Sequence, residues 1–325
     1  MSGYVGRLAP SPTGALHLGN ARSFLVAWLR ARASGGRLIL RIEDLDHPKV
    51  KPGSAAQILD DLRWMGLDWD EGPDIGGGHG PYVQTRRLDL YASALERLRA
   101  AGLVYPCICA RRDVEAGQSA PHASEDGLFY PGTCRGRFAS YAEARSALPP
   151  DRLPAWRFRA PDNAAGRFID LLCGPQRQCV ARETGDFVLA RHPAGAGYML
   201  AVVVDDAAMG VTEVVRGGDL LPATHRQLLL HAALGLPSPA YLHVPLVVGP
   251  DGRRLAKRHG DTRLSAFRQA GVPAARIVGF LARSLGWAAP GEELLPADLV
   301  PRFTLETIPE SPLVVSPDDV ARLMG

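Results

Sequence analysis

The sequence has few cysteines and no long apolar run, and each scarcity excludes a class of protein. No stretch approaches the roughly 20 consecutive apolar residues that span a bilayer. The N-terminus has no basic region followed by an apolar core, so no secretory signal is expected. Five cysteines, an odd number, suit a reducing compartment better than a disulfide framework. We therefore expect a cytoplasmic protein without a membrane partner, with a monomer as the default state.

Net charge is also small, at +3 over 325 residues, so the composition permits a nucleic-acid partner without demanding one. Arginine greatly outnumbers lysine, and arginine suits bidentate contacts to phosphate and carboxylate. A hydrophobic content of 46% and a charged content of 22% are typical of a globular protein. The length is sufficient for two or three domains, each with its own core.

The N-terminal segment has the pattern of a strand, a turn, a helix and a second strand. Tyr4 and Val5 lead into a turn rich in proline and glycine, and helical spacing follows over about 20–33. Residues 37–42 then read as a buried strand with Glu43 at its carboxyl end. This unit builds parallel sheets, which bind ligands beyond the carboxyl ends of their strands. A helix N-terminus beside His17 would also attract an anion. The pattern therefore predicts an α/β fold with an anion site and Glu43 in one crevice.

The remaining pattern predicts further helices and strands around a turn-rich segment. We expect helices over 54–66, with Ser54 as N-cap, and over about 86–101. Strands are expected at 198–204 and 211–216, a helix at 221–234, a hairpin at 244–255 and a mostly helical remainder that includes 277–287. Between residues 102 and about 184 the strands are short and the turns many, which indicates an inserted domain.

A second glycine-bounded loop, Gly252 to Gly260, gathers several cations that include Lys257 ahead of a helix. It is a second candidate for binding an anion, with a solvated basic loop as the alternative.

Three cysteines of the inserted segment, Cys107, Cys109 and Cys134, have a spacing that can hold one tetrahedral Zn²⁺. A fourth ligand is required, and His122 is the conventional candidate; three buried free thiols are the alternative. Cys173 and Cys179 have no partner pattern, and we expect them to be core residues.

The two anion-binding candidates together resemble the signatures of class I aminoacyl-tRNA synthetases. His17-Leu-Gly-Asn20 stands where that family has its HIGH motif, and Arg254-Leu-Ala-Lys-Arg258 stands where it has KMSKS. The stretches RLAPSPTGALHLGN, RIEDLD and VVRGGDLLPATHRQ are similar to the glutamyl and glutaminyl branch, in the right order over roughly residues 4–290. Asn20 replaces the second histidine, and of the two KMSKS lysines only Lys257 is clearly retained.

The resemblance implies a Rossmann-like parallel sheet interrupted by an inserted domain. It divides the chain into a first catalytic half, an inserted α+β domain with the zinc pattern, a second catalytic half, and the KMSKS-like loop with a small helical domain: 1–101, 102–186, 187–243 and 244–325.

The same resemblance implies the chemistry. The α-carboxylate of L-glutamate attacks the α-phosphate of ATP and releases pyrophosphate, without a protein nucleophile, so positioning and charge stabilisation carry the rate. The family pattern assigns catalysis to His17 and Lys257, with Mg²⁺ on the phosphates, and ATP contacts also to Gly19 and Asn20. It places glutamate among Arg7, Leu8, Ala9, Pro10, Ser11, Glu43, Tyr198 and Arg216. The arginines would pair with carboxylates and Glu43 with the ammonium.

A CxC…YxxxC pattern in one small branch of the family points to Tyr130, rather than His122, as the fourth zinc ligand. Fewer than 70 residues follow the KMSKS-like loop, which leaves no room for the anticodon-binding domain of a full glutamyl-tRNA synthetase. Together these features resemble a short branch that activates glutamate without tRNA and transfers it to queuosine, the wobble base of tRNA(Asp). Arg111, Arg112, Arg135 and Arg137 are then candidate phosphate contacts, with solvated surface as the alternative. Two other functions remain open: charging the 3′ end of tRNA(Glu), or non-catalytic tRNA binding.

Overall fold

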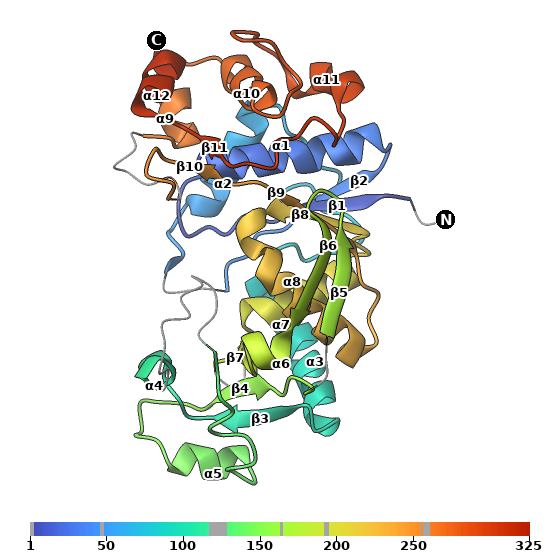
Figure 1. Ribbon diagram of the computed structural model, residues 1–325, viewed down its shortest axis with the longest axis vertical. Coiled ribbons are helices and arrows are strands. Elements are labelled where there is room, and N and C mark those ends of the chain that lie inside the picture. Colours follow the sequence, from blue (N-terminus) through green and yellow to red (C-terminus); the bar gives the residue numbers. More distant parts are fainter. Residues whose placement is uncertain are drawn as a thin grey trace.

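A mostly parallel sheet lies at the centre of the elongated molecule, between two groups of helices (Figure 1). The computed structural model describes residues 3–45, 49–116, 129–162, 165–191, 195–253, 255 and 261–325. Strand β1 (Val5–Leu8) pairs in parallel with β2 (Arg37–Leu40). Strand β8 (Glu213–Gly217) pairs in parallel with β9 (Ala240–Val244). The Thr212 amide donates to the Val5 carbonyl at 2.9 Å and joins the two pairs. On the far side of β9 follow β5 (Ala165–Asp170), in parallel, and β6 (Gly174–Cys179), antiparallel.

Two helices connect the parallel pairs and cover opposite faces of the sheet (Figure 1). Helix α1 (Leu18–Ala33) joins β1 to β2, and α8 (Leu221–Leu234) joins β8 to β9. The apolar side chains of α1 lie in a core shared with β1, β2 and the C-terminal helices, whereas α8 belongs to a second core with α3 (Leu88–Ala100) and α7 (Tyr198–Ala208). The expected α/β fold is confirmed.

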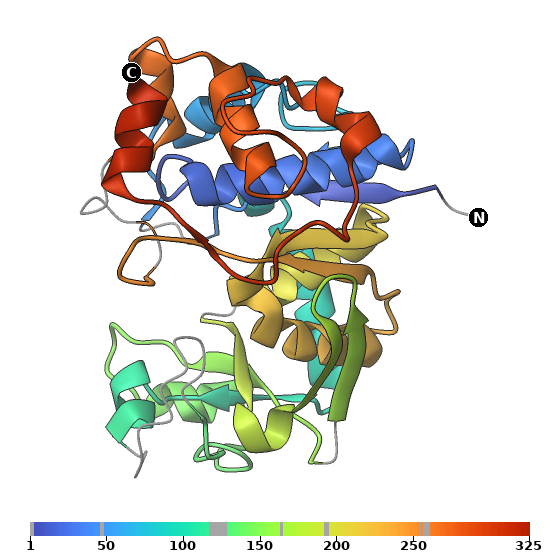
Figure 2. The ribbon, with the colours of Figure 1, turned by 45° about the horizontal axis from the view of Figure 1, so that its top comes forward.

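The inserted part forms a separate antiparallel sheet at the lower end of the molecule (Figures 1 and 2). Its strands are β3, β4 and β7: Val104–Cys107, Ala155–Phe158 and Phe187–Ala190. The short helices α4, α5 and α6 accompany it: Arg111–Ala116, Tyr141–Ser146 and Val180–Glu183. Sheet pairing does not follow the expected boundary at residue 186. Strands β5 and β6 join the central sheet and β7 joins the inserted one, because a strand's partners are set by long-range pairing rather than chain order.

The C-terminal helices lie beside α1 at the opposite end of the molecule (Figure 2). They are α9, α10, α11 and α12: Leu264–Gln269, Ala274–Arg283, Pro296–Leu299 and Pro317–Met324. Helix α2 spans Ser54–Trp64, and 3-10 turns span Gln84–Arg86, Gly218–Leu220 and Val300–Arg302. Gly53, with φ +78°, precedes α2, so the predicted Ser54 cap is wrong by one residue. None of the described helices has the length and apolar character needed to cross a bilayer.

Two predicted elements are wrong. Residues 198–204 form the start of helix α7 instead of a strand, because Leu200 to Asp206 are all buried and leave no polar face to reveal a helical period. The turn expected near Pro250 forms, with the Gly249 amide donating to the Arg253 carbonyl at 2.8 Å. No strand is found opposite β10 (Val247–Val248) among the residues of 244–255 that the structure describes. Instead, β10 pairs in parallel with β11 (Leu313–Val314), a partner far along the chain.

Candidate active site and cysteine cluster

A cavity of about 600 Å³ lies where β1 and β8 end and where α1 and α7 begin. Most of the residues predicted to bind glutamate or ATP line it: Arg7, Ala9, Pro10, Ser11, His17, Gly19, Asn20, Glu43, Tyr198 and Arg216. Leu8 does not, because its side chain is fully buried in the core below β1. Lys257 lies outside the described residues, as do Arg254 and His122.

The N-terminus of α1 is held at the cavity by a reciprocal cap. The Gly19 amide donates to Nδ1 of His17 at 3.0 Å, and the His17 amide donates to Oδ1 of Asn20 at 3.2 Å. Because Nδ1 accepts, the proton of the neutral ring lies on Nε2. Asn20, which departs from the family motif, therefore provides half of the cap. The positive end of the helix dipole and the His17 ring together make this edge suitable for a phosphate.

A buried network of alternating charges lies on the other side of the cavity. Arg41 donates from Nη2 to Glu43 at 3.0 Å, and its Nη1 lies 2.8 Å from Asp206. Arg7 donates from Nη1 to the Val215 carbonyl at 2.8 Å, and its Nε lies 3.7 Å from Asp206. The network therefore holds one cation and one carboxylate, Arg7 and Glu43, at the cavity wall.

Burial shifts the titration of these groups. It raises the pKa of Glu43, although Arg41 and Arg7 oppose the shift, so a cation placed beside Glu43 would favour its ionised form. Burial also lowers the pKa of Arg7, and Asp206 opposes this. Sequence reasoning missed Arg41 and Asp206 as members of the site. The only signal was their position beside Glu43 in RIEDLD and at the end of the apolar run 198–204.

Arg216, at the end of β8, is fixed by contacts on two sides. Its Nη2 donates to Thr224 at 2.7 Å and to Gln227 at 2.8 Å. Its Nη1 contacts the Tyr198 hydroxyl at 3.4 Å, which is the only Nη1 partner among the described residues. Burial raises the pKa of Tyr198, so this hydroxyl stays protonated at neutral pH. The guanidinium thus presents one nitrogen, next to a hydroxyl, to the cavity.

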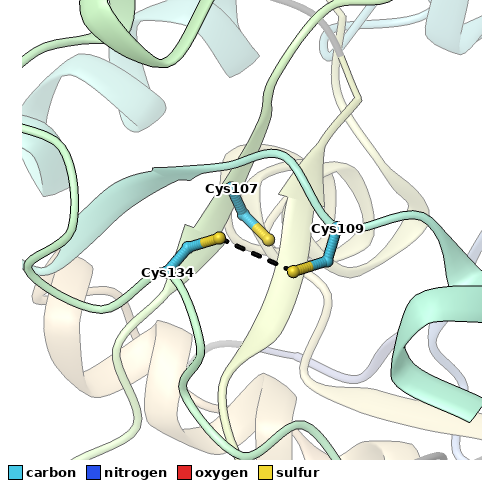
Figure 3. Close-up of side chains that lie close together, drawn as sticks. All are labelled: Cys107, Cys109 and Cys134. Carbon is cyan, nitrogen blue, oxygen red and sulfur yellow. Dashed lines mark hydrogen bonds between the residues drawn. The ribbon is translucent and has the colours of Figure 1, made fainter. Parts of the chain in front are cut away.

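The three cysteines of the predicted metal site converge (Figure 3). Cys107, Cys109 and Cys134 have sulfur atoms within 4.8 Å of one another, and the Cys109 and Cys134 sulfurs are 3.6 Å apart. The Tyr130 hydroxyl lies 3.4 Å from the sulfur of Cys107 and 3.8 Å from that of Cys109. Hydrogen bonding with Cys107 lowers the pKa of Cys134, which favours a thiolate there.

These four donors fit a tetrahedral ion. With Zn–S near 2.3 Å and Zn–O near 2.0 Å, tetrahedral geometry requires S–S separations of about 3.8 Å and S–O separations of about 3.5 Å. The separation of the Cys109 and Cys134 sulfurs is close to the first value, and the distances from the Tyr130 oxygen to the sulfurs of Cys107 and Cys109 are close to the second. The cysteine cluster could therefore bind a metal ion, and the Tyr130 hydroxyl oxygen lies close enough to the sulfurs to serve as a fourth ligand.

Two other sequence expectations have different outcomes. Cys173 is exposed and Cys179 half-buried, so the prediction of core residues is wrong; both lie in the β5–β6 hairpin at the sheet edge. Arg135 donates from Nε to buried Asp186 at 2.9 Å and forms a structural ion pair, whereas Arg112 is largely exposed.

The comparisons with known proteins agree with this geometry. The family described as "tRNA synthetases class I (E and Q), catalytic domain" matches residues 5–311. The chain is 52% identical to a glutamyl-Q tRNA(Asp) synthetase of Symbiobacterium thermophilum over 98% of both chains. It is 50% identical to one of Nitratidesulfovibrio vulgaris over 98% of this chain and 97% of the relative. The solved glutamate tRNA ligase of Elizabethkingia meningosepticum in complex with its amino acid superposes with a TM-score of 0.83 at 27% identity, over 98% of this chain and 68% of that one. The chain therefore belongs to the class I tRNA synthetases, a family of ligases, in their glutamyl and glutaminyl branch.

Proposed function

We propose that the protein activates L-glutamate with ATP, without tRNA, and then transfers the glutamate to queuosine at the wobble position of tRNA(Asp). The observation that carries the activation step is the pairing, in one cavity, of two arginines and a carboxylate with a capped helix N-terminus. Glutamate has two carboxylates and one ammonium, and these are the charges that such a wall complements. The reaction would take place in the cytoplasm, where tRNA and ATP meet.

In this proposal Arg7 and Nη1 of Arg216 bind the carboxylates, and Glu43 accepts from the ammonium while Arg41 holds it from behind. The α-carboxylate oxygen then attacks the α-phosphorus of ATP, and the bond to the leaving pyrophosphate breaks. The N-terminus of α1 and the His17 ring would stabilise the phosphate charge, with Lys257 as the second cation and Mg²⁺ supplied with ATP. Positioning supplies most of the rate because no covalent enzyme intermediate is needed.

The acceptor is proposed from the relatives. The relatives named glutamyl-Q tRNA(Asp) synthetase match this chain over 97–98% of their own length at 50–52% identity, whereas the chain covers 68% of the glutamate tRNA ligase. The adenylate would be attacked by a hydroxyl of the cyclopentenediol ring, which forms an ester and releases AMP. Charging the 3′ end of tRNA(Glu) is the competing function.

We also propose that the cysteine cluster holds one structural Zn²⁺ through Cys107, Cys109, Tyr130 and Cys134. The three thiols and the tyrosine oxygen come from the end of β3 and from the segment 130–134, which is otherwise short of regular structure. A bound ion would fix these two segments to each other, as structural zinc does in other small domains.

The transfer step is tested with labelled glutamate and three purified RNAs: queuosine-containing tRNA(Asp), unmodified tRNA(Asp) and tRNA(Glu). We expect label only on the first, in an ester that mild base removes. Equal labelling of the two forms of tRNA(Asp) would contradict the proposed acceptor, and labelling of tRNA(Glu) alone would support the competing function.

A further inference from the structure

Behind Arg216, two buried residues form a chain of hydrogen bonds that ends on its Nε. Nε2 of His243 lies 3.0 Å from Nε of Arg216, and Nδ1 of His243 lies 2.6 Å from Oδ2 of Asp170. The exposed fraction of His243 is 0% and that of Asp170 is 1%. The two residues lie on neighbouring strands, β9 and β5, so the sheet itself sets their separation.

The hydrogen bonds determine the tautomer of the His243 ring. Arginine Nε carries a hydrogen at every accessible pH and can only donate, so Nε2 of His243 must accept. The proton of the neutral ring therefore lies on Nδ1, from which it is donated to Asp170. Burial lowers the pKa of His243, although the hydrogen bond with Asp170 opposes this shift. The lowered pKa keeps the ring neutral.

Backbone donors fix the orientation of the Asp170 carboxylate in turn. Its Oδ1 accepts from the amides of Leu172 at 3.0 Å and Cys173 at 2.8 Å. The second oxygen, Oδ2, is therefore the one that faces Nδ1 of His243. Although burial acts to raise it, the pKa of Asp170 is lowered by the His243 and backbone hydrogen bonds, so the carboxylate is ionised and accepts at both oxygens.

We propose that Asp170 and His243 are positioning residues for the amino-acid substrate, because together they fix Nε of Arg216 and so direct its Nη1 toward a glutamate carboxylate. Thr224 and Gln227 already hold Nη2, so the contact from His243 to Nε locks the plane of the guanidinium. A planar donor fork transfers such an orientation directly to its bound carboxylate. The inference rests on the proposed function, since it assumes that Arg216 binds glutamate.

The substitution Asp170→Asn tests the chain with almost no change in volume. The backbone amides of residues 172 and 173 donate, so they keep the carboxamide oxygen of the new side chain as their acceptor, and its NH₂ group must face Nδ1 of His243. The ring then has to accept at Nδ1 and carry its proton on Nε2. Nε–H of Arg216 loses its acceptor and faces a donor, while the new Nε2–H can turn only to Oγ1 of Thr224, 3.2 Å away. We expect the KM for glutamate to rise by roughly 10- to 100-fold, as for loss of a hydrogen bond to a charged group, while the KM for ATP changes by less than about threefold.

Both KM values are measured by ATP–pyrophosphate exchange, and ¹⁵N-histidine NMR reads the tautomer directly. We expect the wild-type protein to carry the His243 proton on Nδ1 and the Asp170→Asn variant to carry it on Nε2. Asp186→Asn is the matched control, because Asp186 is an equally buried carboxylate that accepts from a backbone amide, at Ala160, in the inserted sheet. It should leave both KM values unchanged, whatever its effect on stability.

A second pair of variants separates positioning from folding. In His243→Gln the amide oxygen can replace Nε2 as the acceptor, so glutamate affinity should be largely retained, whereas His243→Leu should lose it. A wild-type Nε2–H tautomer, or equal rises of the two KM values in Asp170→Asn, would overturn the inference. If the wild-type protein catalyses exchange and Asp170→Asn leaves the KM for glutamate unchanged, the inference is overturned too. Absence of exchange in the wild-type protein would instead contradict the proposed function.

Discussion

Replacing Gly19 with alanine separates the position of the His17 ring from the stability of helix α1. A Cβ at residue 19 would lie 2.9 Å from Cε1 of His17, closer than real Cβ contacts come, and 3.0 Å from its Nδ1, which is tighter than most such contacts. The next atom, Cβ of Val247 at 3.7 Å, would be in ordinary contact. The His17 ring therefore has to move, and it loses the hydrogen bond from the Gly19 amide.

The magnitudes predict an active-site defect without unfolding. Alanine in place of a helical glycine contributes up to about 1 kcal/mol of stability, and loss of the cap costs about 1 kcal/mol, so the two effects nearly cancel. Activity should fall much further, because removing one positioned donor from a developing phosphate charge lowers the rate by roughly 100-fold. We expect kcat for ATP–pyrophosphate exchange to drop by that order, with the urea midpoint within about 0.5 M of wild type.

A double-mutant cycle decides whether the effect runs through His17. His17→Asn removes the imidazole but keeps a good N-cap residue, so it should lower kcat by a similar factor. The combined variant should then be no slower than the slower single variant, because both changes remove one interaction. Multiplied losses in the combined variant, or a wild-type rate for Gly19→Ala, would refute the assignment of His17.

Three further changes have outcomes that follow from the structure. Glu43→Gln removes the carboxylate proposed for the ammonium, so the KM for glutamate should rise roughly 10- to 100-fold in exchange assays while that for ATP holds. Tyr130→Phe leaves the metal only three thiols, so zinc affinity in a chelator competition should fall about tenfold or more. Burial raises the pKa of Asp61 to about 6, despite Arg268 at 3.1 Å. The folded state therefore takes up a proton as pH falls, and from pH 7 to 4 wild type should gain about 1–3 kcal/mol of unfolding free energy relative to Asp61→Asn.

Each of these predictions has a result that contradicts it. Equal rises of both KM values in Glu43→Gln would mean a general distortion of the cavity. Unchanged zinc affinity in Tyr130→Phe, together with loss of zinc affinity in His122→Ala, would identify His122 as the fourth ligand instead of Tyr130. A stability difference between wild type and Asp61→Asn that stays flat with pH would show that Asp61 titrates normally in the fold.

Local sequence pattern predicted the elements whose signals are local. The bounds of α8 are those expected, 221–234, because its apolar residues recur at helical spacing and the pattern ends at Gly235, which adopts φ +60°. Helix α7 was misassigned because a helix buried on all sides has no period to detect. The β10–β11 pair was missed because its partners are remote in the chain.

The site divides along the same line. His17 and Glu43 stand in motifs at the start of a helix and the end of a strand, so pattern and resemblance were sufficient to place them at one cavity. Arg41, Asp170 and His243 support the site from behind, across neighbouring strands, and each looks like an ordinary strand residue in the sequence. Only the three-dimensional register of β5, β8 and β9 brings the last two to Arg216.

The most direct test of the account is ATP–pyrophosphate exchange with purified protein, Mg²⁺ and no RNA. The account predicts exchange that requires L-glutamate and is not supported by L-glutamine. Exchange should be lost in Arg216→Ala, because that change removes the Nη1 that we propose to bind a glutamate carboxylate. Exchange that appears only after tRNA(Glu) is added, or no exchange with any amino acid, would contradict the central claim that this cavity makes glutamyl-adenylate by itself.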